Sequence, residues 1–306
     1  MVGIAEQLKG QPSALWQAAW RRFRRSWTAV LGLAVLSGLV LAVLVGPWVY
    51  PGSATLIDFG QAAAPPSWAH PFGTNDLGQD QLARVLVGGR ISLAVGFAAM
   101  VVSISLGVGI GAIAGFYGGI LDGLLMRFTD LFLALPQLPL LLLVVYLFRN
   151  TARAIAGPEW GIFWLVVVVI GGLNWMSTAR LVRAGFLSLR HRDFIAAVRA
   201  MGAGPAHLIW HHLLPNVLSP VIVSATLAIA TAILTESTLS FLGLGFPPDV
   251  PTWGRMLFDA YNRIETAPHM AVFPGLMLFL AVLSINYVGD GLQDALDPRR
   301  ESRGGE

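Results

Sequence analysis

Three histidines, His207, His211 and His212, lie within about one helical turn of one another, and two imidazole rings at such a spacing can share a metal ion. A metal centre needs further ligands, and this chain has no cysteine and no carboxylate near these histidines in sequence. We therefore favour polar residues at the entrance of a membrane helix over a metal site.

Two carboxylates, Asp130 and Glu236, fall inside apolar stretches. Ionisable groups at membrane depth usually face a bundle interior or a water-filled cavity, so both are candidates for a translocation path. Arg127 precedes Asp130 by three residues, and we favour a local ion pair between them. For Glu236, a structural hydrogen-bonding role and a role in a translocation path are equally supported.

Enzyme motifs are missing from the sequence. A phosphate-binding P-loop requires a lysine within G-x-x-x-x-G-K-[ST], and Lys9, in "EQLKGQP", lies outside any such loop. We find no H-E-x-x-H, G-x-S-x-G or G-x-G-x-x-G motif and no nucleophile–base pair for an intramembrane enzyme. The chain is therefore predicted not to be an enzyme, and any ATP-driven work requires a partner.

The elements that position these residues are predicted to be membrane helices. Hydrophobic residues make up 55% of the 306 residues and charged residues 12%, against roughly 25% charged in soluble domains. Apolar stretches reach the length of about 20 residues that crosses a bilayer. We predict six spans, at residues 27–49, 91–116, 123–148, 161–187, 208–236 and 269–290.

Prolines and glycines fall inside several of these spans. Membrane helices tolerate such residues where neighbouring groups satisfy the freed backbone. The prolines are Pro136, Pro139, Pro215 and Pro220. In the second span, close helix packing is predicted at Gly107, Gly109, Gly111 and Gly115.

Before the first span, the sequence predicts an interfacial helix that Ser13 could cap. Aromatic residues recur at helical spacing among arginines, which suits a helix in the headgroup layer. These aromatic residues are Trp16, Trp20, Phe23 and Trp27. The alternative is a plain basic flank of the first span.

The basic residues predict the orientation of the chain. If the N-terminus is cytoplasmic, the inner segments hold fourteen lysines and arginines and the outer segments six, and this bias places both termini in the cytoplasm. The outer six are Arg84, Arg90, Arg149, Arg153, Arg255 and Arg263. A net charge of +3 with arginines beside apolar spans does not indicate nucleic-acid binding.

The segment "DFIAAVRAMGAGPAHLIWHHLLPN", residues 193–216, lies between two spans on the predicted cytoplasmic side. It is expected to open as a short helix capped by Asp193, and Gly202, Gly204 and Pro205 should end it. One face of this helix is apolar and would lack cover in water alone. Its residues are Phe194, Ile195, Val198 and Met201.

This segment resembles the cytoplasmic E-A-A signature of ABC-importer permeases. Ala196-Ala197-Val198 stands in the E-A-A place, Gly202 follows at the expected distance, and Leu214-Pro215 begins twelve residues after that glycine. Ala196 replaces the glutamate, and His212 stands where isoleucine is usual. The replacement removes a polar contact that the family makes with its ATPase, and Asp193 is a candidate substitute.

Further blocks look like the C-type permease of dipeptide and oligopeptide importers, and the similarity extends over about residues 13–300. The blocks are residues 70–96, 121–136, 236–257 and 286–299. The resemblance implies an all-α membrane protein with the six transmembrane helices of a type I ABC-importer permease, an N-terminal interfacial helix and a cytoplasmic coupling helix at about 192–204.

The implied division is an N-terminal arm (1–26), a first span with an outer loop (27–90), a permease core (91–290) and a cytoplasmic tail (291–306). The coupling helix would dock on an ATPase and move when the ATPase pair closes. Its implied coupling residues are Asp193, Phe194, Ile195, Ala196, Ala197, Val198, Arg199, Met201 and Gly202.

The implied partners are a B-type permease, two ATP-binding subunits that hold ATP and Mg²⁺, an extracytoplasmic substrate-binding protein and membrane lipid. The implied location is the cell membrane of a prokaryote. The resemblance favours peptides as the substrate, with nickel complexes or other small solutes as alternatives. An ion-coupled secondary transporter is the competing class, but it would need internal repeats and several ionisable or unwound sites near the midplane.

Overall fold

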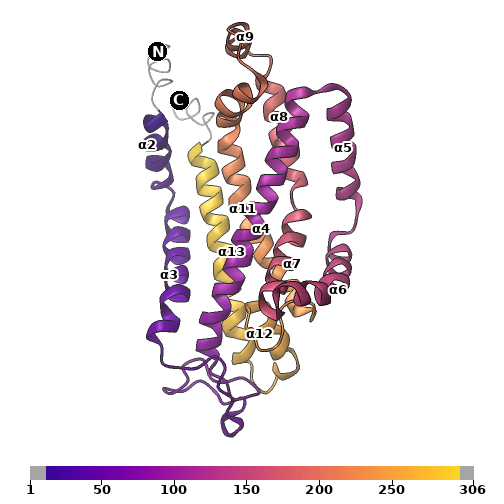
Figure 1. Cartoon of the computed structure of the whole chain (residues 1–306). Helices are drawn as coiled ribbons and strands as arrows, with labels where there is room; N and C mark the ends of the chain where they lie inside the picture. The colour runs from indigo at the N-terminus through magenta and orange to yellow at the C-terminus, as the bar shows by residue number, and fades with distance from the viewer. Residues whose placement is uncertain (1–11, 297–306) are drawn as a thin grey trace.

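The computed structural model describes residues 12–296, which form a bundle of long helices (Figure 1). The long helices that we use below are α3 (Trp27–Val49), α4 (Gln81–Tyr117), α6 (Gln137–Ala156), α11 (Leu214–Phe241) and α13 (His269–Leu296). The shorter helices are α2 (Pro12–Phe23), α5 (Gly119–Ala134), α7 (Pro158–Gly172), α8 (Met176–Leu189), α9 (Asp193–Ala200), α10 (Pro205–His207) and α12 (Trp253–Ala260).

Within residues 12–296, five helical segments are long and apolar enough to cross a membrane, and the bent pair α7–α8 makes a sixth if it counts as one span. The first is α3, which has the bounds predicted for it, 27–49. Its residues are predominantly apolar and none of them is charged. Ser26 caps it by accepting a hydrogen bond from the backbone N–H of Ala29, so its start is also marked in the sequence.

Helix α4 begins at Gln81, ten residues before the predicted start of the second span. Asp80 caps it by accepting from the N–H of Ala83 at 2.8 Å. The predicted outer loop is therefore shortened to residues 51–80. At about 1.5 Å per residue, the 37 residues of α4 extend for about 55 Å.

The third predicted span, 123–148, is wrong as one continuous helix. The chain breaks at Leu135, whose backbone is extended, and Pro136 precedes α6. A residue before proline is disfavoured in the helical conformation, which accounts for the break. By length and composition the crossing segment is α6, 137–156.

The fourth span is also interrupted. Helices α7 and α8 meet at an angle of 44° across residues 173–175. In the fifth, the apolar segment runs from Pro205 to Phe241, and a π-helical turn, Leu208–Leu213, comes between α10 and α11. The sixth, α13, continues to Leu296, into the predicted tail; residues 297–306 lie outside the described part.

Helices α4 and α8 pack closely through glycines spaced four residues apart. A Cβ at Gly111 would lie 2.4 Å from the carbonyl oxygen of Ala179, and one at Gly107 would lie 2.6 Å from Cβ of Thr178. Gly115 meets Phe186 in the same way. Gly109 does not belong to this contact, because no described heavy atom lies within 4 Å of its Cβ position.

The two ends of the bundle differ. Helices α2 and α9 and the C-terminal end of α13 lie at one end, while residues 51–80 and α12 form the other (Figure 1). This arrangement places the described parts near both termini at the same end as α9.

Helix α2 begins at Pro12, so Ser13 lies in its first turn rather than before it. Its aromatic residues do not share one environment. Phe23 is buried with Ala19 against Ala29 and Ala295, whereas Trp20 is exposed, as is Trp27 at the start of α3. The predicted interfacial helix therefore ends before Trp27, and its Phe23 is covered by the bundle although it stacks on the exposed Trp20. The side chain of Trp16 lies outside the described part.

Candidate coupling helix and polar groove

Helix α9 projects from the end of the bundle and is fixed to it by one deeply buried side chain (Figure 1). Ile195 is 0% exposed and packs in a cluster with Phe186, Leu208 and Leu213. Val198 is half-buried against the same cluster. The apolar face predicted for this helix is therefore partly covered by the chain itself.

The rest of the predicted face remains open. Phe194 is 44% exposed and Met201 is 79% exposed. Ala196, Ala197 and Arg199 are exposed as well. An outward surface with large apolar side chains on a short, anchored helix is suited to docking on another protein.

Asp193 is not the cap of this helix. Arg192 holds the N-cap position without a side-chain hydrogen bond, and Asp193 is the first helical residue. Its exposed carboxylate still lies in the first turn, where the helix dipole favours negative charge.

Gly202 ends the helix in a left-handed conformation, with φ of +89°. The N–H of Gly202 donates to the carbonyl of Arg199 at 3.0 Å, and the N–H of Ala203 donates to that of Val198 at 3.3 Å. These two bonds form a Schellman motif, and the apolar pair Val198 and Ala203 accompanies it. The expected role of Gly202 in the backbone turn is confirmed.

After α9, His207 directly precedes the π-helical turn, and His211 and His212 lie within it. The rings of His207 and His211 stack with centroids 4.4 Å apart, and His212 meets His207 edge-on at 5.3 Å. Among residues 12–296, no group of three or more potential ligand side chains is placed to hold a metal ion.

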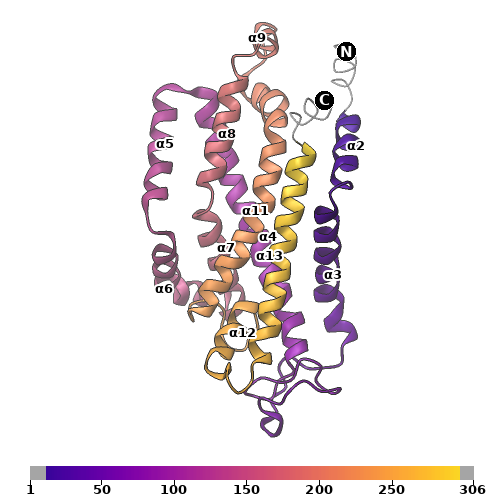
Figure 2. The same ribbon diagram turned by 180° about the vertical axis from the view of Figure 1, so that it is seen from behind.

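A groove of about 820 Å³ opens between α8, α11 and the C-terminal part of α13. In Figure 2, α8 lies between α5 and α11. Among the described residues, the lining of the groove contains no charged side chain. The polar lining residues are Asn174, Ser177, Thr178, Asn216, Ser219, Ser224, Thr231 and Gln293.

Glu236 does not line this groove. Its carboxylate is 0% exposed and accepts hydrogen bonds from Ser240 at 2.7 Å and from Ser92 of α4 at 3.1 Å. The N–H of Trp253, at the start of α12, donates to the same Ser92 hydroxyl. This geometry corresponds to the structural alternative for Glu236, since its hydrogen bonds join α11 to α4 near α12.

The predicted local pair between Asp130 and Arg127 is wrong. Asp130 instead pairs with Arg180 of α8, with 2.5 Å between Oδ1 and Nη2. Asp130 is 58% exposed and Arg180 is 53% exposed. The two residues are 50 positions apart, so the spacing rule for a single helix could not have found this pair.

A second ion pair joins the same two helices. Arg183 of α8 contacts both carboxylate oxygens of Asp122, one of them at 2.7 Å. These side chains are only 33% and 13% exposed. Helix α5 is thus attached to α8 by one largely buried pair and one exposed pair.

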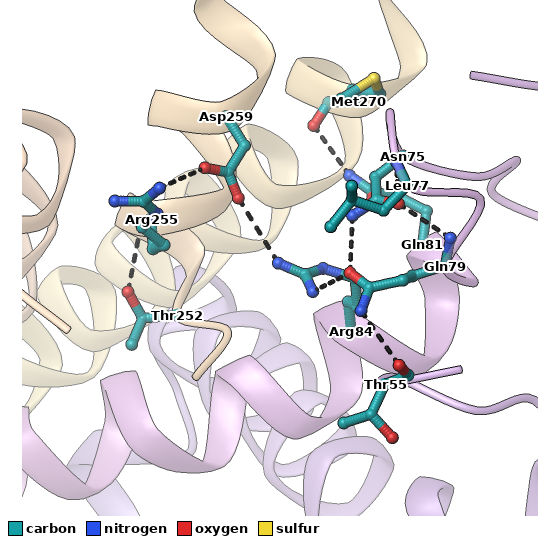
Figure 3. Close-up of polar contacts among 10 residues, drawn as sticks. All are labelled: Thr55, Asn75, Leu77, Gln79, Gln81, Arg84, Thr252, Arg255, Asp259 and Met270. Carbon is teal, nitrogen blue, oxygen red and sulfur yellow. Dashed lines mark hydrogen bonds and ion pairs between the residues drawn. The ribbon is translucent and has the colours of Figure 1, made fainter. Parts of the chain in front are cut away.

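At the opposite end, a polar network ties the loop 51–80 and α12 to α4 (Figure 3). Arg84, 2% exposed, donates to Gln79 at 2.5 Å and pairs with Asp259 at 3.4 Å. Arg255 pairs with the other oxygen of Asp259 at 2.9 Å. Burial raises the pKa of Asp259 above its ordinary value, although both guanidiniums act in the opposite direction.

Sequence reasoning missed the groove and the network. The groove was detectable in part, because Asn216, Ser219, Ser224 and Thr231 recur on one face of a helix in an otherwise apolar span. The polar network around Arg84 could not be detected from the sequence, because Arg84 and Asp259 are 175 positions apart.

Comparison with known protein families shows which family the chain belongs to. Residues 107–302 match the model of the inner membrane component of binding-protein-dependent transport systems. The chain belongs to this family. Residues 14–66 also match the N-terminal transmembrane domain of oligopeptide transport permease C. The chain is thus a multi-pass membrane permease subunit of an ABC importer, a class that works with a second permease, ATPase subunits and a binding protein.

Individual relatives agree with this assignment. A protein named as a peptide permease in Brucella suis biovar 1 is 44% identical, covering 92% of this chain and 90% of the relative. The oligopeptide transport system permease OppC of Haemophilus influenzae is 37% identical, covering 96% and 92%. A chain from the MetNI methionine ABC transporter shares the fold, with a TM-score of 0.55 and 21% identity over 70% of this permease and 96% of that chain.

Proposed function

We propose that this permease is the C-type subunit of an ATP-driven importer of peptides and that it forms half of the translocation path. The groove between α8, α11 and α13 carries this proposal. Its lining contains both uncharged polar side chains and apolar ones such as Leu181 and Val223. A peptide offers backbone amides and variable side chains, and such a lining can meet both without binding them tightly. The names of the relatives point to the same substrate class.

The proposed partners are a B-type permease, two ATP-binding subunits and an extracytoplasmic substrate-binding protein, with lipid around the exposed apolar faces. ATP and Mg²⁺ are assigned to the ATP-binding subunits, because Lys9 lies outside any P-loop sequence. Helix α9 would be the coupling helix, and Phe194 and Met201 would enter a cleft of the ATPase, since they are the large apolar side chains that it leaves exposed.

In this proposal the chain lies in the cell membrane of a prokaryote with both termini and α9 in the cytoplasm. The bias of basic residues supports this orientation. The end formed by residues 51–80 and α12 would then face the substrate-binding protein.

The test is reconstitution of the permease with its partner subunits in proteoliposomes. We expect uptake of dipeptides that requires both ATP and the binding protein. Uptake of Ni²⁺ or another small solute that dipeptides do not inhibit would favour the alternative substrate. Uptake by this chain alone, driven by an ion gradient without ATPase subunits, would contradict the proposal and support a secondary transporter.

A further inference from the structure

The exposed ion pair between Asp130 and Arg180 lies well away from the α9-side end of α8. Arg180 is nine residues from the α9-side end of α8, about 14 Å of helix. Charged side chains at such depth face water-filled cavities or protein rather than lipid. More than half of each side chain is nevertheless exposed.

Arg180 of this pair lies near the groove along α8. Arg180 lies on α8 between Ser177 and Leu181, both of which line the groove. The exposed positions of α8, including Ser177 and Arg180, follow one stripe along the helix. The described lining residues of the groove carry no charge, and Arg180 and Asp130 lie outside this lining. Arg180 is three residues from the lining residue Ser177 on the same exposed stripe, so the pair places charges of both signs beside the groove.

Attachment of α5 to α8 does not depend on this pair. The largely buried contact of Asp122 with Arg183 already joins the two helices. In addition, the rings of Phe128 and Phe132 lie 6.2 and 6.3 Å from that of Trp175, just before α8. An exposed ion pair adds little stability. A role as a helix clamp therefore accounts poorly for Asp130 and Arg180.

We propose that Asp130 and Arg180 bind the two charged ends of a zwitterionic peptide, with Asp130 receiving the ammonium group and Arg180 the carboxylate. The assignment rests on the proposed peptide function and names the residues that recognise free termini within the permease. A guanidinium has five N–H donors, and the pair with Asp130 uses Nη2, so the other donors can meet a carboxylate. Separating an exposed pair costs little, and the ligand replaces it with two charge-assisted contacts.

The test measures peptide binding to the complete purified importer in the absence of its binding protein. The probe is radiolabelled alanyl-phenylalanine, and the competitors are the same dipeptide, its N-acetyl form and its C-terminal amide. For the wild type, we expect the free dipeptide to compete on the order of tenfold better than either blocked form, the ratio typical of a lost charged hydrogen bond.

The variants separate the two ends of the ligand. Arg180→Gln should lose the preference over the amide and keep the preference over the N-acetyl form; Asp130→Asn should do the reverse. Arg180→Lys should retain most of the preference over the amide. The matched control is Asp122→Asn, which removes the neighbouring pair between the same helices and should keep both preferences.

Equal loss of both preferences in Arg180→Gln, Asp130→Asn and Asp122→Asn would overturn the proposal and show a helix clamp. Absence of peptide binding, or of any preference, in the wild-type importer would also overturn it. The peptide function is judged separately, by ATP-dependent dipeptide uptake in wild-type proteoliposomes. Uptake without this end-specific pattern refutes the proposed site alone, whereas lack of uptake refutes the function.

Discussion

Ser92 of α4 donates a hydrogen bond to Glu236 of α11, with 3.1 Å between Oγ and Oε2, and accepts one from the N–H of Trp253. This hydroxyl thus connects two long helices to the start of α12. All three side chains are fully buried. Water cannot reach these buried groups to replace their hydrogen bonds, so removal of the Glu236 carboxylate should lower the stability of the protein.

We predict that Glu236→Ala lowers the thermal stability of the purified complex, at a cost of about 1–3 kcal/mol for the polar groups left unpaired. Glu236→Gln keeps an acceptor for Ser92 or Ser240 and should be much closer to the wild type. Peptide uptake per folded complex should be retained in Glu236→Gln. A Glu236→Gln complex of normal stability that transports nothing would instead place Glu236 in the translocation path.

Gly111 and Gly109 offer a matched pair of substitutions in one helix. Gly111→Val should separate α4 from α8 and reduce assembly of the complex, because even a Cβ at Gly111 lies 2.4 Å from the carbonyl oxygen of Ala179. Gly109→Val should be tolerated, since no described atom lies within 4 Å of its Cβ position. Size-exclusion chromatography and thermal unfolding measure both effects, and equal behaviour of the two variants would contradict the packing described here.

Gly202 and Gly204 form a second matched pair, near α9. Gly202 has φ of +89°, so any side chain strains the turn by roughly 1 kcal/mol or more, although space around it is open. Gly204 has an extended backbone with φ of −74° and equally open space. Gly202→Val should leave membrane insertion intact but reduce transport and binding-protein-stimulated ATP hydrolysis, and Gly204→Val should not.

The measurement for this pair is ATP hydrolysis and uptake in proteoliposomes of equal subunit content. A Gly202→Val importer that transports at the wild-type rate would remove the end of α9 from the coupling mechanism. Weaker membrane insertion of Gly202→Val would show that the turn is needed for the fold of the spans.

The predicted orientation can be checked with single cysteines, because the chain has none of its own. Ser67 is exposed at the end formed by residues 51–80, and His191 is exposed beside α9. In intact cells, an impermeant thiol reagent should label Ser67→Cys and not His191→Cys; permeabilised cells should label both. The opposite pattern would invert the topology.

How much the sequence predicts depends on the range of the interactions involved. The bounds of α3 were predicted because its hydropathy and its Ser26 cap are local properties. The turn at Gly202 was predicted for the same reason. The early start of α4 was missed because a charged residue, Arg84, indicates a loop when the sequence is considered alone. Only the structure shows that Arg84 is buried with its partners Gln79 and Asp259.

The candidate site shows the same limit. A helical rule gave Asp130 the partner Arg127, whereas the fold gives it Arg180 of α8, three helices after α5. The outward side chains Phe194 and Met201 were expected on the coupling face, but the inward turn of Ile195 and Val198 depends on α8 and α11, which no local pattern describes.

The glycine contact between α4 and α8 also has a mechanical meaning. It extends over Gly107, Gly111 and Gly115, so the two helices cannot slide or separate without breaking several close contacts at once. Helix α8 leads directly into α9, while the far end of α4 holds Gln79, Asp259 and the backbone of Met270 through Arg84 and Gln81. We therefore expect α4 and α8 to move as one rigid unit, so that a displacement of α9 would reach the opposite end of α4.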